Sequence, residues 1–238
     1  DIIIQFIPFL RRQATLAIAH YSDSLVLNGD TTNAATGNIN LDDADPADTK
    51  HYLAFDGIRH AGLVDNTANS KDAAGAVTFG LLRDIVGRMI DSARFVDWGH
   101  PSDPGDVIHA CDPETADRIA TLDEVIKYKQ TQGIPLLNGE VARILGRPVI
   151  SSIAVSKTEA DGKVSTTAAN NTKGQVVTYN RRGFVWGWRR RVKLETERLP
   201  GRDQTRLVYS LRSGFGRFTP TGAASGIEAS DTLFNITL

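Results

Sequence analysis

Residues 191–211 read RVKLETERLPGRDQTRLVYSL. Val192, Leu194 and Thr196 alternate with charged residues before the central Pro200-Gly201 step. The alternation resumes after that step. A period of two is typical of β-strands that have one apolar and one polar face. Because Pro-Gly favours a turn, the stretch predicts one long antiparallel hairpin. Its predicted apolar face consists of Val192, Leu194, Thr196, Leu207, Tyr209 and Leu211.

Near its beginning the chain predicts a long helix. Apolar residues recur at steps of three and four between Phe9 and Leu27, which is the spacing of one helix face. Pro8 precedes this pattern, where proline is tolerated at a helix start. Asn28-Gly29-Asp30 should end the helix, because these residues readily adopt left-handed or turn conformations. The recurring residues are Leu10, Ala14, Ala17, Tyr21 and Leu25.

Strands and helices should alternate in the middle of the chain. After a polar loop at 31–50, Thr78 can cap a helix whose apolar face includes Ile85. A strand is expected at 106–110, followed by a helix that Asp112 caps and that runs from Pro113 to about Val125. Another strand should span 146–155, and Asp161-Gly162 should form a hairpin turn. With the long helix and the long hairpin, these elements predict a mixed α+β fold.

The composition of the 238 residues excludes several classes of protein. No apolar run reaches the ~20 residues that a membrane-spanning helix needs, so no membrane partner is expected. A net charge of −1 cannot attract a polyanion through total charge. The single cysteine, Cys111, cannot form an internal disulfide, which suits a reducing cytosol. The apolar start at Asp1 has neither an initiator methionine nor a signal leader, which predicts that Asp1 was once interior to a longer chain.

Catalytic, metal and cofactor sites are not expected. His109, Cys111 and Asp112 could suggest a metal cluster, but strand alternation places Asp112 on the opposite face, and two ligands do not close a site. A buried cysteine and a helix cap explain these residues better. The five histidines lie near no nucleophile elbow, and the Gly214-Phe215-Gly216 run is too short for a nucleotide-binding loop.

Two segments have strongly unbalanced charge. The segment from Asp30 to Asp65 contains seven aspartates and two basic residues, which gives it a net charge of −5. The segment from Arg181 to Arg217 contains eleven basic residues and three acidic ones, which gives it a net charge of +8. The basic segment could be a solvated hairpin face or a sequence-independent nucleic-acid surface. The preferred interpretation is that it contacts the acidic loop of a second copy. The predicted contact residues are Asp42, Asp43, Asp45, Arg189, Arg190 and Arg191.

The order of the elements and several short motifs resemble the major capsid proteins of tailed double-stranded-DNA phages, the fold named after phage Hong Kong 97. Leu27-Asn28-Gly29-Asp30-Thr31 resembles the end of that family's spine helix, and Phe55-Asp56-Gly57-Ile58 resembles the start of its axial lobe. Leu145-Gly146-Arg147-Pro148-Val149 resembles its Gly-x-Pro-Val strand, and 197–218 its peripheral hairpin. The family's N-terminal arm and extended loop do not fit into 1–8, so no crosslink is carried over to this chain.

The resemblance implies a spine helix and acidic loop of a peripheral domain at 1–54, an axial domain at 55–184, a peripheral hairpin at 185–213 and a C-terminal return at 214–238. It also implies self-assembly into hexamers and pentamers of an icosahedral shell, without enzymatic activity or cofactors. Portal proteins, possible decoration proteins and non-specifically packaged double-stranded DNA are the implied partners. The implied location is the virion capsid, assembled in the host bacterial cytoplasm. The alternatives are an encapsulin-type compartment and a basic nucleic-acid-binding domain.

Overall fold

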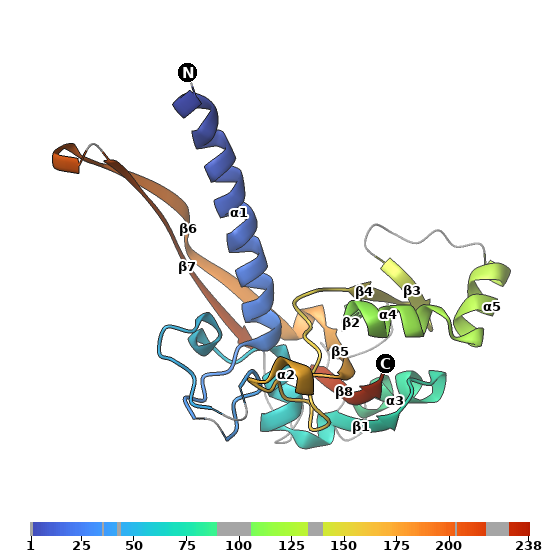
Figure 1. The fold of residues 1–238 in the computed structure, drawn as a ribbon. Coiled ribbons are helices and arrows are strands. Elements are labelled where there is room, and N and C mark those ends of the chain that lie inside the picture. The colour runs from blue at the N-terminus through green and yellow to red at the C-terminus, as the bar shows by residue number, and fades with distance from the viewer. Residues whose placement is uncertain are drawn as a thin grey trace.

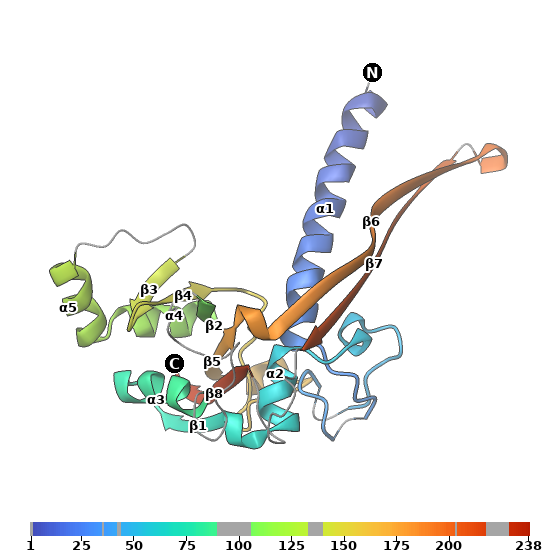
Figure 2. The same ribbon diagram turned by 180° about the vertical axis from the view of Figure 1, so that it is seen from behind.

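A computed structural model describes residues 2–34, 36–41, 44–89, 106–132, 140–202, 204–217 and 229–238. Two elements project from a compact lobe: the N-terminal helix and a long two-stranded ribbon (Figure 1). They leave the lobe close together and diverge toward their far ends, as the view from behind also shows (Figure 2). Within the described ranges, no helix combines the length and the apolar character needed to cross a membrane.

Helices and strands are mixed along the chain, which confirms the predicted α+β class. The helices are α1 (Ile2–Asn28), α2 (Ile58–His60), α3 (Phe79–Met89), α4 (Pro113–Ala120) and α5 (Asp123–Gln132). Short helical turns are η1 (His51–Ala54), η2 (Ala61–Asp65), η3 (Thr67–Asn69), η6 (Ala168–Asn170), η7 (Arg181–Gly183) and η8 (Pro200–Arg202). The strands are β1 (Ser70–Gly75), β2 (Val107–Cys111), β3 (Glu140–Ile144), β4 (Arg147–Ser151), β5 (Lys173–Asn180), β6 (Phe184–Leu199), β7 (Gln204–Arg217) and β8 (Ser230–Thr237).

The helix α1 is longer than predicted. It begins at Ile2, so Pro8 lies inside it, and the expectation that Pro8 starts the helix is wrong. Proline removes one backbone donor, a local loss that the other turns of a 27-residue helix tolerate. At ~1.5 Å per residue, α1 is about 40 Å long. Its end at Asn28 agrees with the prediction.

Side-chain caps define two helix starts where the sequence predicts them. Thr78 Oγ1 accepts a hydrogen bond from the Leu81 N–H (3.3 Å) at the start of α3. The Asp112 carboxylate accepts hydrogen bonds from the N–H (2.9 Å) and the hydroxyl (2.6 Å) of Thr115 at the start of α4. These bonds satisfy donors that the first turn of a helix leaves free.

Three expected elements differ in the structure from their predictions. The helix expected to run to Val125 is interrupted after Ala120, where the Thr121 hydroxyl donates a hydrogen bond to the Arg118 carbonyl (2.8 Å) and helps to terminate α4. The strand expected at 146–155 stops at Ser151, because the chain then turns. Gly162 occupies a turn with a positive φ of 82°, but the segments that it joins are not paired strands.

Six strands form one sheet in the order β1-β8-β5-β2-β4-β3, and β6 with β7 forms a separate antiparallel ribbon. Alternation along the strands divides the buried residues between the two faces of the sheet. Cys111 and Val176 pack with α3, α4 and α5 in the larger core. Their neighbours Ala110 and Val177 pack with Leu27 of α1 and with Ile58 in a second core, against which the ribbon base also packs. The projecting elements are therefore rooted on the face opposite α3.

We predict that Ile85→Asp prevents soluble folding. Ile85 is fully buried on α3, and an unpaired carboxylate there would cost several kcal/mol. Arg83→Asp is the matched control, because the Arg83 side chain is 63% exposed on the same helix. Circular dichroism and thermal melting of the purified variants measure the difference. A folded Ile85→Asp variant with wild-type melting would contradict the assigned core face.

A buried ion pair predicts a pH dependence. Arg88 donates two hydrogen bonds to Asp231 on β8, at 2.7 and 2.6 Å. Burial raises the pKa of Asp231 to about 6, and the Arg88 charge opposes that shift without cancelling it.

Because this folded-state pKa lies above the ordinary value of 3.8, the contribution of Asp231 to stability is fully present below that value and is lost as the pH rises through about 6. Wild type should therefore lose stability relative to Asp231→Asn between about pH 4 and about pH 7. Urea denaturation across this range measures the difference. Parallel stability curves for the two proteins would refute the expected shift.

Candidate assembly surface

The two motifs that end α1 and precede α2 meet at a tight junction of backbone. Gly57 N–H donates to the Gly29 carbonyl (2.8 Å), and Asp30 N–H donates to the Tyr52 carbonyl (2.8 Å). A Cβ on Gly29 would collide with the Phe55 carbonyl oxygen, and one on Gly57 would lie 2.7 Å from the Gly29 nitrogen. Only glycine permits so close an approach of two chain segments.

A buried arginine secures this junction. Arg59 is fully buried, and its guanidinium donates to Asn28 Oδ1 (2.7 Å) and to the Gly162 carbonyl (2.8 Å). Burial lowers the pKa of Arg59 to about 10, while the Asp30 carboxylate opposes this shift. Asp30 is itself fully buried and accepts hydrogen bonds from the backbone N–H groups at positions 32 (2.8 Å) and 39 (2.7 Å). The hydrogen bonds of Arg59 and those of Asp30 thus hold the end of α1, the following loop and the lobe together.

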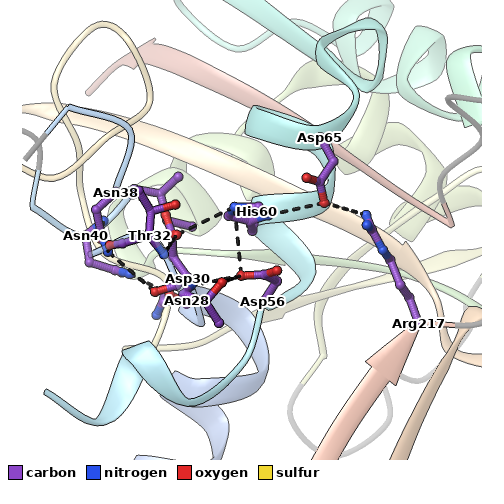
Figure 3. A network of polar contacts seen from close by, with 11 residues as sticks. Asn28, Asp30, Thr32, Asn38, Asn40, Asp56, His60, Asp65 and Arg217 are labelled. Carbon is purple, nitrogen blue, oxygen red and sulfur yellow. Dashed lines mark hydrogen bonds and ion pairs between the residues drawn. The ribbon is translucent and has the colours of Figure 1, made fainter. Parts of the chain in front are cut away.

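His60 lies among three carboxylates at the same junction (Figure 3). Its Nε2 is 3.5 Å from Asp30 Oδ1 and 3.9 Å from Asp56 Oδ1, and its Nδ1 is 3.2 Å from Asp65 Oδ2. Asp65 also pairs with Arg217 Nη1 (2.7 Å) at the end of β7. A chain of polar contacts therefore connects the end of α1 to the base of the ribbon.

Asp30, Asp56 and His60 are residue types that bind metals, and their ligand atoms lie within 4.8 Å of one another. Protein donors already engage both carboxylates, however, since Asp56 Oδ1 accepts hydrogen bonds from the N–H (2.9 Å) and hydroxyl (2.8 Å) of Thr31. Burial alone would raise the pKa of Asp56, but the Thr31 bonds and the charges of His60 and Arg217 lower it. The contacts support a network that holds the shape of the junction.

His109, Cys111 and Asp112 have structural partners. His109 Nδ1 lies 2.8 Å from Thr178 Oγ1, and burial together with the Arg147 charge lowers the pKa of His109 to about 3, which keeps the imidazole neutral. Cys111 is buried, and burial raises its pKa, so its thiol is unreactive. Asp112 caps α4. These contacts describe core packing and a helix cap.

The ribbon and α1 expose apolar side chains. No residue of β6 or β7 is buried, and neither strand pairs with any other described strand. Two-stranded ribbons alone are at best marginally stable in water. Seven of the eleven large hydrophobic residues exposed in the described ranges lie on these two elements, which makes them the candidate contact surface. They are Phe9, Leu16, Tyr21, Val185, Trp188, Val192 and Val208.

The predicted contact residues are only partly placed. Arg189, Arg190 and Arg191 are exposed on β6, and Arg190 donates to Ser210 Oγ (2.8 Å). Asp45 is exposed in the loop before η1, whereas Asp42 and Asp43 lie outside the described residues. The Arg217–Asp65 pair, which the sequence did not suggest, joins the basic and acidic segments within one chain.

Sequence reasoning also missed an open groove of about 770 Å³ at the ribbon base. It lies between the last turns of α1 and both strands of the ribbon, and its walls include Leu25, Phe55, Trp188, Leu211, Arg189 and Arg212. The Trp188-Arg189 pair was visible in the sequence as an aromatic residue beside basic ones. Its apposition to Leu25 and Phe55 depends on contacts between distant segments and has no local signal.

No protein-family model matches the chain, and no curated protein does. Among solved structures, a chain described as Mycobacterium phage Che8 is 8% identical and aligns with a TM-score of 0.44 over 74% of this chain and 56% of that one. A chain from the asymmetric unit of the bacteriophage PhiM1 mature capsid is 11% identical, with a TM-score of 0.45 over 74% of this chain and 59% of that one. This chain therefore spans less than two thirds of both.

We predict that Asp30→Ala destabilises the junction by about 2–5 kcal/mol, because it leaves the N–H groups at positions 32 and 39 without their acceptor and removes a negative charge that favours the Arg59 cation. Asp48→Ala is the matched control: Asp48 is exposed in the same acidic segment, and its loss should change stability by about 0.5 kcal/mol or less. Chemical denaturation measures both values. Equal, small losses for the two variants would show that Asp30 does not stabilise the junction.

Proposed function

We propose that this chain is a shell subunit, the major capsid protein of a tailed double-stranded-DNA phage, and that it assembles with copies of itself into the icosahedral head. The observation that carries the proposal is the ribbon of β6 and β7, which extends from the lobe with no buried residue and with exposed apolar side chains. Such an element gains stability when neighbouring copies cover it. The family resemblance of the sequence motifs supports the same function.

Shell assembly places two physical demands on a subunit. Each contact must be weak enough to be corrected while the shell closes, and many repeated contacts together must make the closed shell stable. Long projecting elements meet both demands, because they spread contact over several neighbours. In the proposed hexamers and pentamers, 55–184 and the 214–238 return form the axial domain, whereas 1–54 and 185–213 form the periphery.

The proposed partners follow from this function. They are other copies of the chain, a portal, decoration proteins where the phage has them, and packaged double-stranded DNA held without sequence preference. The proposed location is the virion capsid after assembly in the host bacterial cytoplasm. Neither a catalytic role nor a cofactor is part of the proposal.

One observation favours a second candidate function, a free nucleic-acid-binding domain. Arg189 and Arg212 flank the exposed Trp188, and cations beside an aromatic ring suit single-stranded nucleic acid. This candidate requires a monomer or dimer whose affinity for DNA falls steeply with salt. An encapsulin-type compartment shares the shell but encloses cargo enzymes, so native particles without portal, tail and DNA would identify it.

The prediction is that purified full-length protein forms capsomers or closed shells that sediment far faster than a monomer. Leu16→Glu should reduce assembly without unfolding the subunit, because Leu16 is 45% exposed on α1 and a charge there opposes burial by a neighbour. Gln13→Glu is the matched control, with the same new charge at another exposed position of α1. Sedimentation velocity and negative-stain electron microscopy measure assembly.

One outcome would contradict the proposed function, and a second would contradict only the contact role of α1. A wild-type protein that remains monomeric under all assembly conditions would exclude a shell subunit. Particles whose yield is equally insensitive to Leu16→Glu and Gln13→Glu would keep the shell function but remove α1 from the contact surface.

A further inference from the structure

The ribbon is irregular where it borders the groove. Pairing between β6 and β7 runs regularly from Phe184↔Arg217 to Trp188↔Ser213, and then the register shifts twice, between Trp188 and Arg190 and between Arg190 and Lys193. In each shift β6 contributes one residue more than β7. Such bulges bend a strand and redirect its side chains, and they are frequent next to binding sites.

The groove beside these bulges combines apolar walls with two cations. Leu25 and Phe55 face Trp188 and Leu211 across it, while Arg189 and Arg212 supply positive charge on the ribbon side. A ligand for this groove must therefore offer small or apolar groups together with negative charge.

Among the described residues, no carboxylate forms an ion pair with the two arginines of the groove. Several cations of the basic segment have carboxylate partners: Arg182 pairs with Asp106 (2.6 Å), Lys193 with Glu195 (2.6 Å) and Arg217 with Asp65 (2.7 Å). In the part of the chain that the structure describes, Arg189 and Arg212 form no such ion pair. Arg190 and Arg191 beside the groove and Arg202 at the ribbon tip likewise form no such pair among the described residues, so the uncompensated charge of the ribbon is greatest in and beside the groove.

This distribution favours an acidic protein segment over nucleic acid. A nucleic-acid strand needs cations along several successive phosphates, typically at least about four nucleotides. Here carboxylates pair with Arg182, Lys193 and Arg217 on either side of the groove, so the unpaired cations around it form one short cluster. Two carboxylates on a short loop match two guanidinium groups more closely.

The chain itself carries a segment of that kind. Residues 44–48 read ADPAD, and Asp45 and Asp48 are exposed together with the small side chains Ala44 and Ala47. Acidic and basic patches at different places on one chain suit a head-to-tail contact between copies, which closes into rings when the rotation permits.

We propose that the groove at the bulged part of the ribbon receives the acidic loop 44–48 of a second copy, with Asp45 and Asp48 pairing with Arg189 and Arg212. The proposal rests on the proposed shell function and names one contact within it. It changes the contact expected from the sequence, because Arg189 and Arg212 line the groove from opposite strands, whereas the consecutive residues Arg190 and Arg191 are not among its walls.

The test is a charge exchange in the full-length protein. Arg189→Glu with Arg212→Glu should lower the assembled fraction by about tenfold or more, because close interfacial charge pairs couple by about 1.5 kcal/mol or more. Adding Asp45→Lys and Asp48→Lys to the same chain should restore assembly to within about threefold of wild type. Arg202→Glu, on the same ribbon at its tip and outside the groove, is the control and should stay closer to wild type.

Sedimentation velocity measures the assembled fraction, and circular dichroism shows whether each variant is folded. If the double glutamate variant does not fold, Arg189→Gln with Arg212→Gln provides the milder form, with a smaller expected loss. Assembly of the folded arginine variants at the wild-type level overturns the proposed contact, and so does a loss that the aspartate reversals fail to rescue. Normal assembly with reduced DNA retention would assign the groove to nucleic acid instead.

The two proposals fail differently. A wild-type chain that never assembles overturns the shell function and this contact together. Wild-type shells combined with unaffected charge variants overturn only the contact.

Discussion

A buried arginine holds the projecting half of this molecule to its compact half. Arg59 binds the last residue of α1 through Asn28 and the 151–172 region through Gly162, and Asp30 supplies the opposite charge. The arrangement exists only because Gly29 and Gly57 let two backbones touch. Leaving a buried charged group without its hydrogen-bond partners costs more than most surface contacts contribute, so we expect the direction in which α1 leaves the lobe to depend on Arg59.

The ribbon depends on the same junction through a second set of contacts. Asp65 joins His60 to Arg217 at the end of β7, and aromatic rings of Phe55, Trp186 and Phe215 pack at the ribbon base. Beyond this base, no described residue of either strand is buried. The molecule therefore fixes the roots of its two projecting elements and leaves their length for contact with neighbours, which is what a shell subunit requires.

Local signals predicted much of the fold. The alternation in 191–211 predicted the ribbon, and Thr78 and Asp112 marked helix starts because a cap acts within three residues. Contacts over long separations were missed: Arg59 reaches partners 31 and 103 residues away, and no short pattern indicates its burial. The groove and the bulges were missed for the same reason, because both depend on contacts between segments that are far apart in the sequence. Asp42 and Asp43 lie outside the described residues, so their predicted contact stays a prediction.

The central claim is that other copies of the chain cover the ribbon and the outer part of α1. Hydrogen–deuterium exchange, compared between assembled particles and dissociated subunits of the same preparation, tests this claim most directly. The account predicts that amides of β6 and β7 exchange rapidly in the dissociated subunit and become strongly protected on assembly, while β5 and β8 are protected in both states. Equal exchange of the ribbon amides in the two states would contradict it.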